Sequence, residues 1–292
     1  LLCRFNTTAV VAAYVSESAL LCNTTASPAG YATVEVSTNG RDYSSSGVRF
    51  ELVSVSVQDV TPWLGPTLGG TVVTIAGSRL AHAESLRCTF GVSKWSTSVY
   101  SSSWSVAASV HGSEGVRCVS PRALPTGWSA LELWSHGTSL RSGASFFVHV
   151  AMYVSAVDPP AGPVSGGTRV SVLGAGFREA ATFRCRFEAS GASVVARHVS
   201  EEQVECASPP SSGAGSRRVE VSLNGQQFST SGVSFTYRPA AAVSSVWPTR
   251  GVSEGGTPVT VLGSGFSAAA EASGALLCRF NTTAVVAAYV SE

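Results

Sequence analysis

The sequence predicts an all-β protein made of successive β-sandwich domains, and three observations carry that prediction. Apolar and polar residues alternate in VTIAG (73–77), VSVLG (170–174), VTVLG (259–263) and VEVS (34–37 and 219–222), the period-2 pattern of half-buried strands. Asn39-Gly40 and Asn224-Gly225 stand between such stretches, and Asn-Gly favours the positive φ angles of a type I′ hairpin turn. No helical periodicity persists for three turns, so short strands joined by turns are expected throughout.

The two ends of the chain carry the same sequence. Residues 1–17 and residues 276–292 both read LLCRFNTTAVVAAYVSE, an offset of 275 residues. Chance does not produce a match of this length, so we expect the chain to be one period, with a short overlap, of a longer repeating polypeptide. The sequence is then expected to continue after residue 292 as SALLC, which places a cysteine 19 positions after Cys278. A cloning artefact is the alternative.

A weaker repeat lies inside this period. Three stretches have a Pro near their start, end in Gly-Gly-Thr and lead into an alternating strand pattern: 61–71, 158–168 and 247–257. Three later stretches also match one another: 34–50, 131–147 and 219–235. The early Pro of each repeat indicates an edge strand, which tolerates a missing N–H donor. The predicted domains are 53–150 and 151–238, with 1–52 as the C-terminal half and 239–292 as the N-terminal half of a third.

The combined pattern resembles a known family. Pro-x-x-Gly-Pro-x-x-Gly-Gly-Thr-x-Val, then Gly-x-Gly-Phe, Cys-x-Ser-Pro, Val-x-Val-x-x-Asn-Gly and Ser-x-Gly-Val-x-Phe together resemble the IPT/TIG domains. The resemblance covers essentially the whole chain and implies tandem Ig-like (IPT/TIG) β-sandwich domains. Such domains occur in plexins, Met-type receptors, Rel-type transcription factors and tandem-repeat surface proteins, so the resemblance specifies fold more than function. The 53–150 repeat departs from it, because His136 replaces the turn Asn and Ser78-Arg79-Leu80 replaces Gly-x-Phe.

The cysteines fall at equivalent places in the repeats. The expected disulfides are Cys3–Cys22, Cys88–Cys118 and Cys185–Cys206, with Cys278 as the copy of Cys3 whose partner is expected beyond residue 292. Each would close a loop of about 20–30 residues, worth roughly 3 kcal/mol in the chain-entropy model. Disulfides persist in oxidising compartments, which predicts an extracellular or cell-surface location. Buried thiols of a cytosolic protein are the alternative; zinc is disfavoured because no Cys-x-x-Cys occurs.

Glycosylation sequons support the same location. Asn6-Thr7-Thr8, Asn23-Thr24-Thr25 and Asn281-Thr282-Thr283 fit the N-glycosylation pattern, and the third copies the first. Two sequons in one repeat, beside an expected disulfide, favour a glycoprotein.

Charge and composition exclude several classes of function. Lys+Arg is 19 and Asp+Glu is 18, so the net charge of +1 disfavours nucleic-acid binding and a polybasic membrane anchor. No run of 18 apolar residues or secretory leader is found, so no membrane span is expected in this segment. Histidines and aspartates occur singly, and the Gly-x-Gly stretches suit turns, so we predict no catalytic residue, metal or cofactor and no enzyme.

Three aromatics of the 53–150 repeat stand where its sister repeats carry small, polar or Pro residues. Trp134 aligns with Ser222 and Ser37, Phe147 with Thr236 and Glu51, and Trp63 with Pro160 and Thr249. Because side chains alternate along a strand, the valines of VEVS are expected to face the core, and Glu220, Ser222, Glu35 and Ser37 to face outward. By that alignment Trp134 also faces outward.

Large outward aromatics are typical of contact sites. We therefore predict Trp63, Trp134 and Phe147 as assembly contacts for a neighbouring repeat, a neighbouring chain or a stacked glycan. The alternative is that this repeat shifts its register or covers the three with its own loop between Cys88 and Cys118, which carries Trp95 and Trp104.

The function predicted from these features is a structural repeat of an extracellular glycoprotein fibre or surface coat, such as a cell-surface or ciliary-surface filament, which self-assembles. One alternative is the ligand-binding or adhesion ectodomain of a receptor. A second is an accessory module of a secreted carbohydrate-active enzyme.

Overall fold

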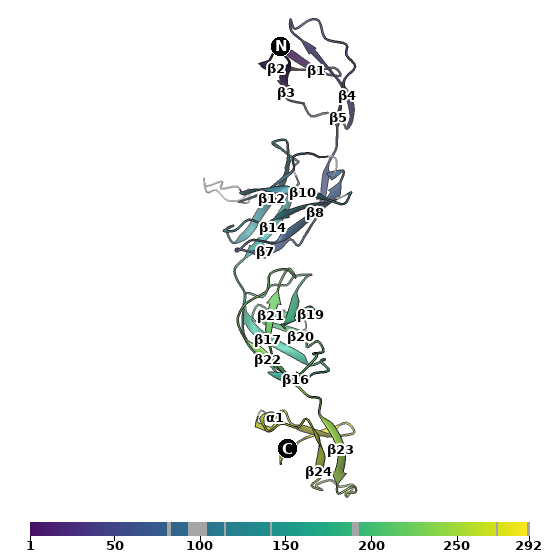
Figure 1. The fold of residues 1–292 in the computed structure, drawn as a ribbon, viewed down its shortest axis with the longest axis vertical. Helices are drawn as coiled ribbons and strands as arrows, with labels where there is room; N and C mark the ends of the chain where they lie inside the picture. The colour runs from purple at the N-terminus through teal and green to yellow at the C-terminus, as the bar shows by residue number, and fades with distance from the viewer. Residues whose placement is uncertain are drawn as a thin grey trace. The chain divides into compact units, whose positions relative to one another are not determined.

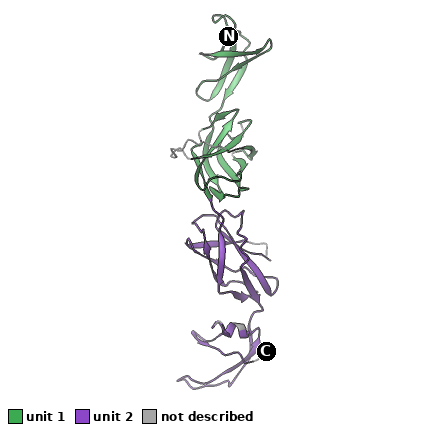
Figure 2. Cartoon of the chain, turned by 90° about the vertical axis from the view of Figure 1, so that its left-hand side faces the viewer, with its two compact units in different colours: residues 1–148 green, residues 149–292 purple. Residues whose placement is uncertain are grey.

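The structure is a computed structural model that describes residues 1–80, 83–92, 104–113, 115–140, 142–188, 193–272 and 274–290. In these ranges the chain consists of β-strands and one short helix, which confirms the all-β prediction (Figure 1). The chain divides into two compact units, Leu1–Val148 and His149–Glu292, which Figure 2 shows in different colours. No helix in the described ranges has the length and apolarity needed to cross a membrane.

The 53–150 domain is a sandwich whose two layers share one strand. Its strands are β6 (Ser56–Thr61), β7 (Leu64–Pro66), β8 (Val72–Ser78), β9 (Arg87–Val92), β10 (Trp104–His111), β11 (Gly115–Val119), β12 (Gly127–Ser135), β13 (Thr138–Ser139) and β14 (Ala144–His149). They pair in the order β6-β8-β11-β10-β9-β12-β14-β7, with β13 beside β12. Residues 104–107 of β10 pair with β9 and residues 108–111 pair with β11, so β10 passes from one layer to the other.

The core of this domain lies between the two layers. Its fully buried members include Ile75 on β8, Phe90 on β9 and Phe146 on β14, and the two phenylalanine rings meet edge to face at 5.4 Å. Leu80, which departs from the Gly-x-Phe pattern, is also fully buried. It occupies the position that Phe177 holds in the next domain, so the departure preserves the core.

The 151–238 domain repeats this topology. Its strands are β15 (Tyr153–Asp158), β16 (Ala161–Pro163), β17 (Arg169–Ala175), β18 (Arg184–Phe187), β19 (Ser193–Ser200), β20 (Gln203–Ala207), β21 (Gly215–Ser222) and β22 (Ser234–Arg238). They pair in the order β15-β17-β20-β19-β18-β21-β22-β16. Here β19 joins the layers, and Phe187 packs edge to face on Phe235 at 5.6 Å.

The terminal segments form smaller sheets. In segment 1–52 the strands are β1 (Leu2–Phe5), β2 (Thr8–Ser16), β3 (Ala19–Cys22), β4 (Gly30–Ser37) and β5 (Arg49–Leu52), in the order β3-β2-β1-β4-β5. In segment 239–292 they are β23 (Ala242–Trp247), β24 (Thr260–Ser264), β25 (Leu277–Phe280) and β26 (Thr283–Val286), with helix α1 (Ala268–Ala272). There β23 pairs with β24, and β25 pairs with β26.

Two local predictions are wrong. The Asn-Gly pairs do not form type I′ turns, because Gly40 and Gly225 have positive φ angles while Asn39 and Asn224 are not among the described residues that do. Instead, the Oδ1 atom of each Asn accepts hydrogen bonds from backbone N–H groups two and three residues later. The Asn side chain thus organises a wider loop, as Asx motifs do.

The outward residues of VEVS are also not solvent-facing. Val219 and Val221 lie in the core as predicted, but Glu220 and Ser222 on the other face are buried too, and Ser37 is buried in segment 1–52. The loop after the strand and the neighbouring strand β18 cover this face. Ser222 Oγ donates to Asn224 Oδ1 in the loop, and Arg186 on β18 pairs with Glu220. Alternation therefore predicted the face of each side chain and not its exposure.

Candidate functional site

Three disulfides link the two layers at equivalent positions. The structure joins Cys3 to Cys22, Cys88 to Cys118 and Cys185 to Cys206, the pairing expected from the repeats, with Cα–Cα distances of 6.2, 6.3 and 6.3 Å. In each case one cysteine lies on the strand before the layer-crossing strand and the other on the strand after it. Cys278 on β25 is free and half-buried. Its expected partner remains a prediction.

The three sequon asparagines are all exposed. Asn6 and Asn281 occupy the tight turns β1–β2 and β25–β26, each with a φ of 52°. Asn6 Oδ1 accepts a hydrogen bond of 2.9 Å from the backbone N–H of Thr33. Asn23 lies directly after β3. These positions suit glycosylation, which remains a prediction.

An aromatic cluster lies on the outer surface of the 53–150 domain. The rings of Trp63 and Trp128 are stacked, with centroids 5.5 Å apart and planes 17° apart. Phe147 meets both edge-on, at 6.4 Å from Trp63 and 5.3 Å from Trp128. Trp63 and Phe147 are half-buried, and Trp128 is 55% exposed. We call Trp63, Trp128 and Phe147 the aromatic cluster.

Backbone pairing assembles the cluster from three separate segments. Trp128 and Phe147 are direct partners on β12 and β14, and the Phe147 N–H donates a 2.8 Å hydrogen bond to the Trp63 carbonyl. Sequence comparison found Trp63 and Phe147 but missed Trp128, because its repeat was aligned only from residue 131 onward. Extending that alignment three residues toward the N-terminus would have paired Trp128 with Ser216.

The sister domain has the same backbone without the rings. Ser216 pairs with Thr236, and the Thr236 N–H donates to the Pro160 carbonyl at 2.9 Å. The aromatic cluster therefore corresponds to Pro160, Ser216 and Thr236, three residues that offer little apolar surface. The fold does not require the aromatics, so they are available for a surface role.

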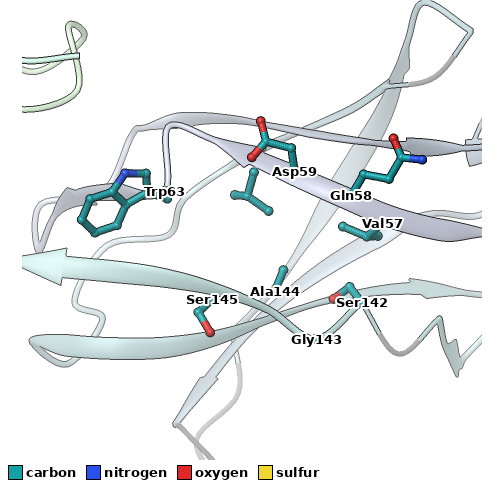
Figure 3. Close-up of a pocket in the computed structure, with 9 residues that line it drawn as sticks. Val57, Gln58, Asp59, Trp63, Ser142, Gly143, Ala144 and Ser145 are labelled. Atoms are coloured by element: carbon teal, nitrogen blue, oxygen red, sulfur yellow. The ribbon is translucent and has the colours of Figure 1, made fainter. Parts of the chain in front are cut away.

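A shallow groove adjoins the aromatic cluster. It has a volume of about 390 Å³ and is lined by Val57, Gln58, Asp59, Val60, Trp63, Ser142, Gly143, Ala144 and Ser145. Figure 3 shows Asp59, Gln58 and Trp63 along one wall, and Ser142 to Ser145 along the other. The groove thus combines an aromatic wall with a carboxylate, an amide and hydroxyl groups, a mixture typical of protein contact surfaces.

Trp134 does not join the aromatic cluster. It lies on β12, on the same outer face as Trp128 but six residues away, which is roughly 20 Å along a strand. Leu131 and Leu133 are fully buried, so the register has not shifted. Trp134 is half-buried, and its Nε1 atom is buried without a hydrogen-bond partner in the structure.

The alternative was that the loop between Cys88 and Cys118, with Trp95 and Trp104, covers Trp63, Trp134 and Phe147. Trp95 lies outside the described residues. Trp104 lies on β10, where it is half-buried and packs against the domain core. Trp63, Trp134 and Phe147 are each half-buried, so they are neither fully covered nor fully exposed to solvent.

Titratable groups in the described ranges do not gather into a reaction centre. No group of three or more His, Cys, Asp or Glu side chains there could hold a metal ion. The shortest charged contacts are ion pairs between opposite residues on neighbouring strands: Arg4–Glu35, Arg186–Glu220 and Arg197–Glu205.

Comparison with known proteins agrees with this fold. The sequence model described as IPT/TIG domain matches residues 56–148, 152–237 and 241–292. Among curated proteins, Plexin-A3 of Homo sapiens is 26% identical over 247 residues, which is 77% of this chain and 12% of the relative. Plexin-A3 of Rattus norvegicus is 25% identical over 228 residues, covering 71% of this chain and 11% of the relative. The chain therefore spans about an eighth or less of these relatives.

Solved structures give weaker likenesses. The full extracellular region of plexin A4 aligns with a TM-score of 0.46 at 18% identity, over 78% of this chain and 19% of that one. The glucan-utilisation protein SGBP-B of Bacteroides ovatus aligns with a TM-score of 0.27 at 12% identity, over 80% of this chain and 57% of that one. The three disulfides place the chain in an extracellular or cell-surface setting, because disulfides persist in oxidising compartments.

Proposed function

We propose that this chain, which belongs to the IPT/TIG domain family, is a repeating structural segment of an extracellular glycoprotein fibre or surface coat. The observation that carries the proposal is the identity of residues 1–17 with residues 276–292. A regular filament needs equivalent contacts at a regular spacing, and a repeat of 275 residues supplies them along one polypeptide.

The aromatic cluster provides the lateral contact in this proposal. One such patch per period lies on the 53–150 domain, and the domain that follows carries Pro160, Ser216 and Thr236 at the equivalent positions. Stacked tryptophans supply large, rigid contact area, which is the character of interface hot spots. The adjoining groove beside Asp59 and Gln58 gives the contact a polar rim. Trp134 is a second candidate contact, separate from the cluster.

Glycans complete the proposed surface. The sequons Asn6 and Asn23 lie in the same segment, and neither lies in the 53–150 domain. Glycans attached there would keep that segment solvated and leave the aromatic cluster uncovered. The proposal assigns no catalytic role to any residue.

Electron microscopy of the full-length protein tests the proposal. We expect filaments or a coat with one axial repeat per sequence period. The double variant Trp128→Ser with Phe147→Thr installs the residues of the sister domain, so it keeps the fold. It should weaken lateral association by about 2 kcal/mol or more, roughly 30-fold. Leu68→Ser, which removes an apolar side chain 70% exposed outside the cluster, is the control. Dispersed single molecules in the unmodified protein would refute the fibre.

A receptor or adhesion ectodomain is the second candidate. The similarity to Plexin-A3 over most of this chain favours it. In that case the aromatic cluster binds a different protein, and the Trp128→Ser variant loses that partner while the protein stays dispersed. Affinity capture of the ectodomain with and without the substitution separates the two functions.

A further inference from the structure

The outer face of the 151–238 domain holds an arginine between a carboxylate and an aromatic ring. Arg186 on β18 lies opposite Glu220 on β21, and the two side chains form an ion pair. The guanidinium carbon of Arg186 lies 4.1 Å from the ring centroid of Phe228, in the loop after β21. A charge-assisted hydrogen bond and a cation–π contact thus act on one side chain. The Glu220 carboxylate is buried because its domain supplies both groups.

Segment 1–52 contains the same arrangement. Arg4 on β1 lies opposite Glu35 on β4 and pairs with it. Its guanidinium carbon lies 4.1 Å from the ring centroid of Tyr43. The arrangement is therefore a shared feature of the outer face of this sheet, formed from one strand pair and the loop that follows it.

The 53–150 domain keeps the carboxylate but not the arginine. Glu132 on β12 lies opposite Thr89 on β9, in the register that joins Glu220 to Arg186 in the sister domain. The stretch 87–90 accordingly reads RCTF, whereas 184–187 reads RCRF. A threonine in this place carries no charge, so β9 offers no cation to the carboxylate.

The aromatic ring of the loop is missing as well. The Leu140 N–H donates a backbone hydrogen bond to the strand before it, as the Ser229 N–H does in the sister domain. The residues just before these two therefore correspond, and Ser139 stands where the sister domain has Phe228. Ser139 Oγ donates to Glu132 Oε2 at 3.2 Å. A hydroxyl group satisfies one acceptor site of the carboxylate but does not balance its charge.

Glu132 has no basic partner among the residues that the structure describes. Arg87, on the same face of β9, instead donates from Nε to Ser105 Oγ at 2.8 Å. Glu132 is half-buried, so water hydrates its carboxylate less than it would on an open surface. A partly desolvated charge without a counter-ion is stabilised by an incoming cation.

Trp134 provides a ring beside this carboxylate. It lies two residues after Glu132 on the same face of β12, which is roughly 7 Å along the strand. It is half-buried and stands where the sister domain has Ser222. Trp128, four residues before Glu132, belongs to the aromatic cluster on the same face. The carboxylate thus lies between two aromatic sites, a setting in which interface arginines are typically found.

We propose that Glu132 and Trp134 bind an arginine side chain of a second copy of this chain. This rests on the proposed function, because it names the residue type that one copy recognises on another at the lateral contact. The incoming guanidinium would form with Glu132 the ion pair that Arg186 forms with Glu220 inside one domain, and would stack on Trp134.

Arginine suits the site better than lysine, because its planar group pairs with a carboxylate through two N–H donors and stacks on aromatic rings. A second copy can supply it, since Lys94 is the only one of the 19 basic residues that is not an arginine.

Sedimentation velocity of the oxidised, secreted 292-residue chain tests the inference. We expect the unmodified chain to self-associate. The double variant Thr89→Arg with Ser139→Phe gives Glu132 an arginine and a ring of its own, as in the sister domain. It should weaken association by roughly 30-fold or more, while the melting temperature of the domain stays the same or rises. Val119→Arg is the matched control, because it adds the same charge at a residue 51% exposed on the other layer.

Glu132→Gln tests the charge alone, because it keeps the shape of the side chain. It should weaken association roughly tenfold and reduce its dependence on salt concentration. Glu84→Gln, which neutralises an exposed carboxylate of the same domain, should have no effect on association.

Arg141 lies outside the described residues, so Arg141→Ser checks whether this chain supplies its own cation to Glu132. We expect the substitution to leave domain stability unchanged. A loss of stability that disappears in the Glu132→Gln background would overturn the inference.

The outcomes separate this inference from the fibre proposal. Association that the Thr89→Arg, Ser139→Phe chain retains in full overturns the arginine site and leaves the fibre proposal standing. An unmodified chain that stays monomeric overturns both the arginine site and the lateral contact, whichever other protein it binds.

Discussion

Replacing Gly65 by alanine is expected to destabilise the 53–150 domain, although the backbone there suits any residue. Gly65 precedes Pro66 on β7 and is not among the glycines with positive φ. A Gly→Ala change at such a site ordinarily stabilises a protein by about 0.4–1 kcal/mol, because it reduces the entropy of the unfolded chain. The packing around Gly65 decides whether the substitution raises or lowers the stability of the domain.

The new methyl group would have no room. It would lie 2.3 Å from Oγ1 of Thr71 and 2.8 Å from Cζ of Phe146. Both side chains are fully buried, and the Phe146 ring is held edge to face by Phe90 at 5.4 Å. Overpacking of this kind costs about 1–3 kcal/mol, and two immobile contacts place Gly65→Ala at the upper end. A net loss of about 2 kcal/mol corresponds to a melting temperature lower by roughly 10 °C for a domain of this size.

Tryptophan fluorescence during denaturation measures this domain selectively, because five of the six tryptophans lie between residues 53 and 150. The matched control is Gly91→Ala in the same domain, where a Cβ atom would meet nothing within 4 Å. We expect Gly91→Ala to be neutral or slightly stabilising. Equal stability of the Gly65 and Gly91 variants would refute the steric reasoning.

Three further predictions concern other parts of the chain. Arg186→Ala should cost roughly 2–4 kcal/mol in chemical denaturation, because it leaves the buried Glu220 carboxylate without its partner, and replacing both residues by leucine should recover most of that loss. Tyr237→Phe should cost about 1 kcal/mol at neutral pH, since the phenol donates to the Pro209 carbonyl at 2.8 Å. Burial raises the pKa of the Tyr237 phenol above 10.0 in the folded protein. As the pH rises past that value, the unfolded chain loses the phenolic proton first, so the unmodified protein loses stability. The difference in unfolding free energy between the unmodified protein and Tyr237→Phe should therefore shrink in a pH series. Asn6→Gln should lower the mass of the secreted protein by one glycan; an unchanged mass contradicts glycosylation at that turn.

The sequence was sufficient to predict the fold because strand alternation and the internal repeats can both be read without knowing which strands pair. Strand alternation identified VTIAG and VSVLG, and the internal repeats placed every cysteine at an equivalent position, so the pairs followed by comparison. The same rules failed where a longer-range contact decided the outcome. Glu220 faces away from the core as predicted, yet a loop and Arg186 bury it. Asn39-Gly40 predicts a tight hairpin turn, but the Asn39 side chain accepts hydrogen bonds from the backbone N–H groups of Arg41 and Asp42, and a wider loop forms instead.

The aromatic surface was only half predictable for the same reason. Trp63 and Phe147 are separated by more than 80 residues, and their proximity depends on the pairing of β7 with β14, which no local sequence pattern indicates. Trp128 completes the stack through its cross-strand register with Phe147. A sequence comparison can show that a residue is unusual for its repeat. It cannot show which unusual residues meet.

The position of the aromatic cluster also explains how it arose without disturbing the domain. Its three members occupy outward positions, while the inward neighbours Phe146 and Ser129 are buried. Exchanging the sister residues Pro160, Ser216 and Thr236 for large rings therefore changes the surface and leaves the core packing alone. The same separation holds in segment 1–52, where Tyr31 takes the Trp128 position and is 65% exposed. Inward positions thus keep the core packing the same in the 53–150 and 151–238 domains, and outward positions allow their surfaces to differ.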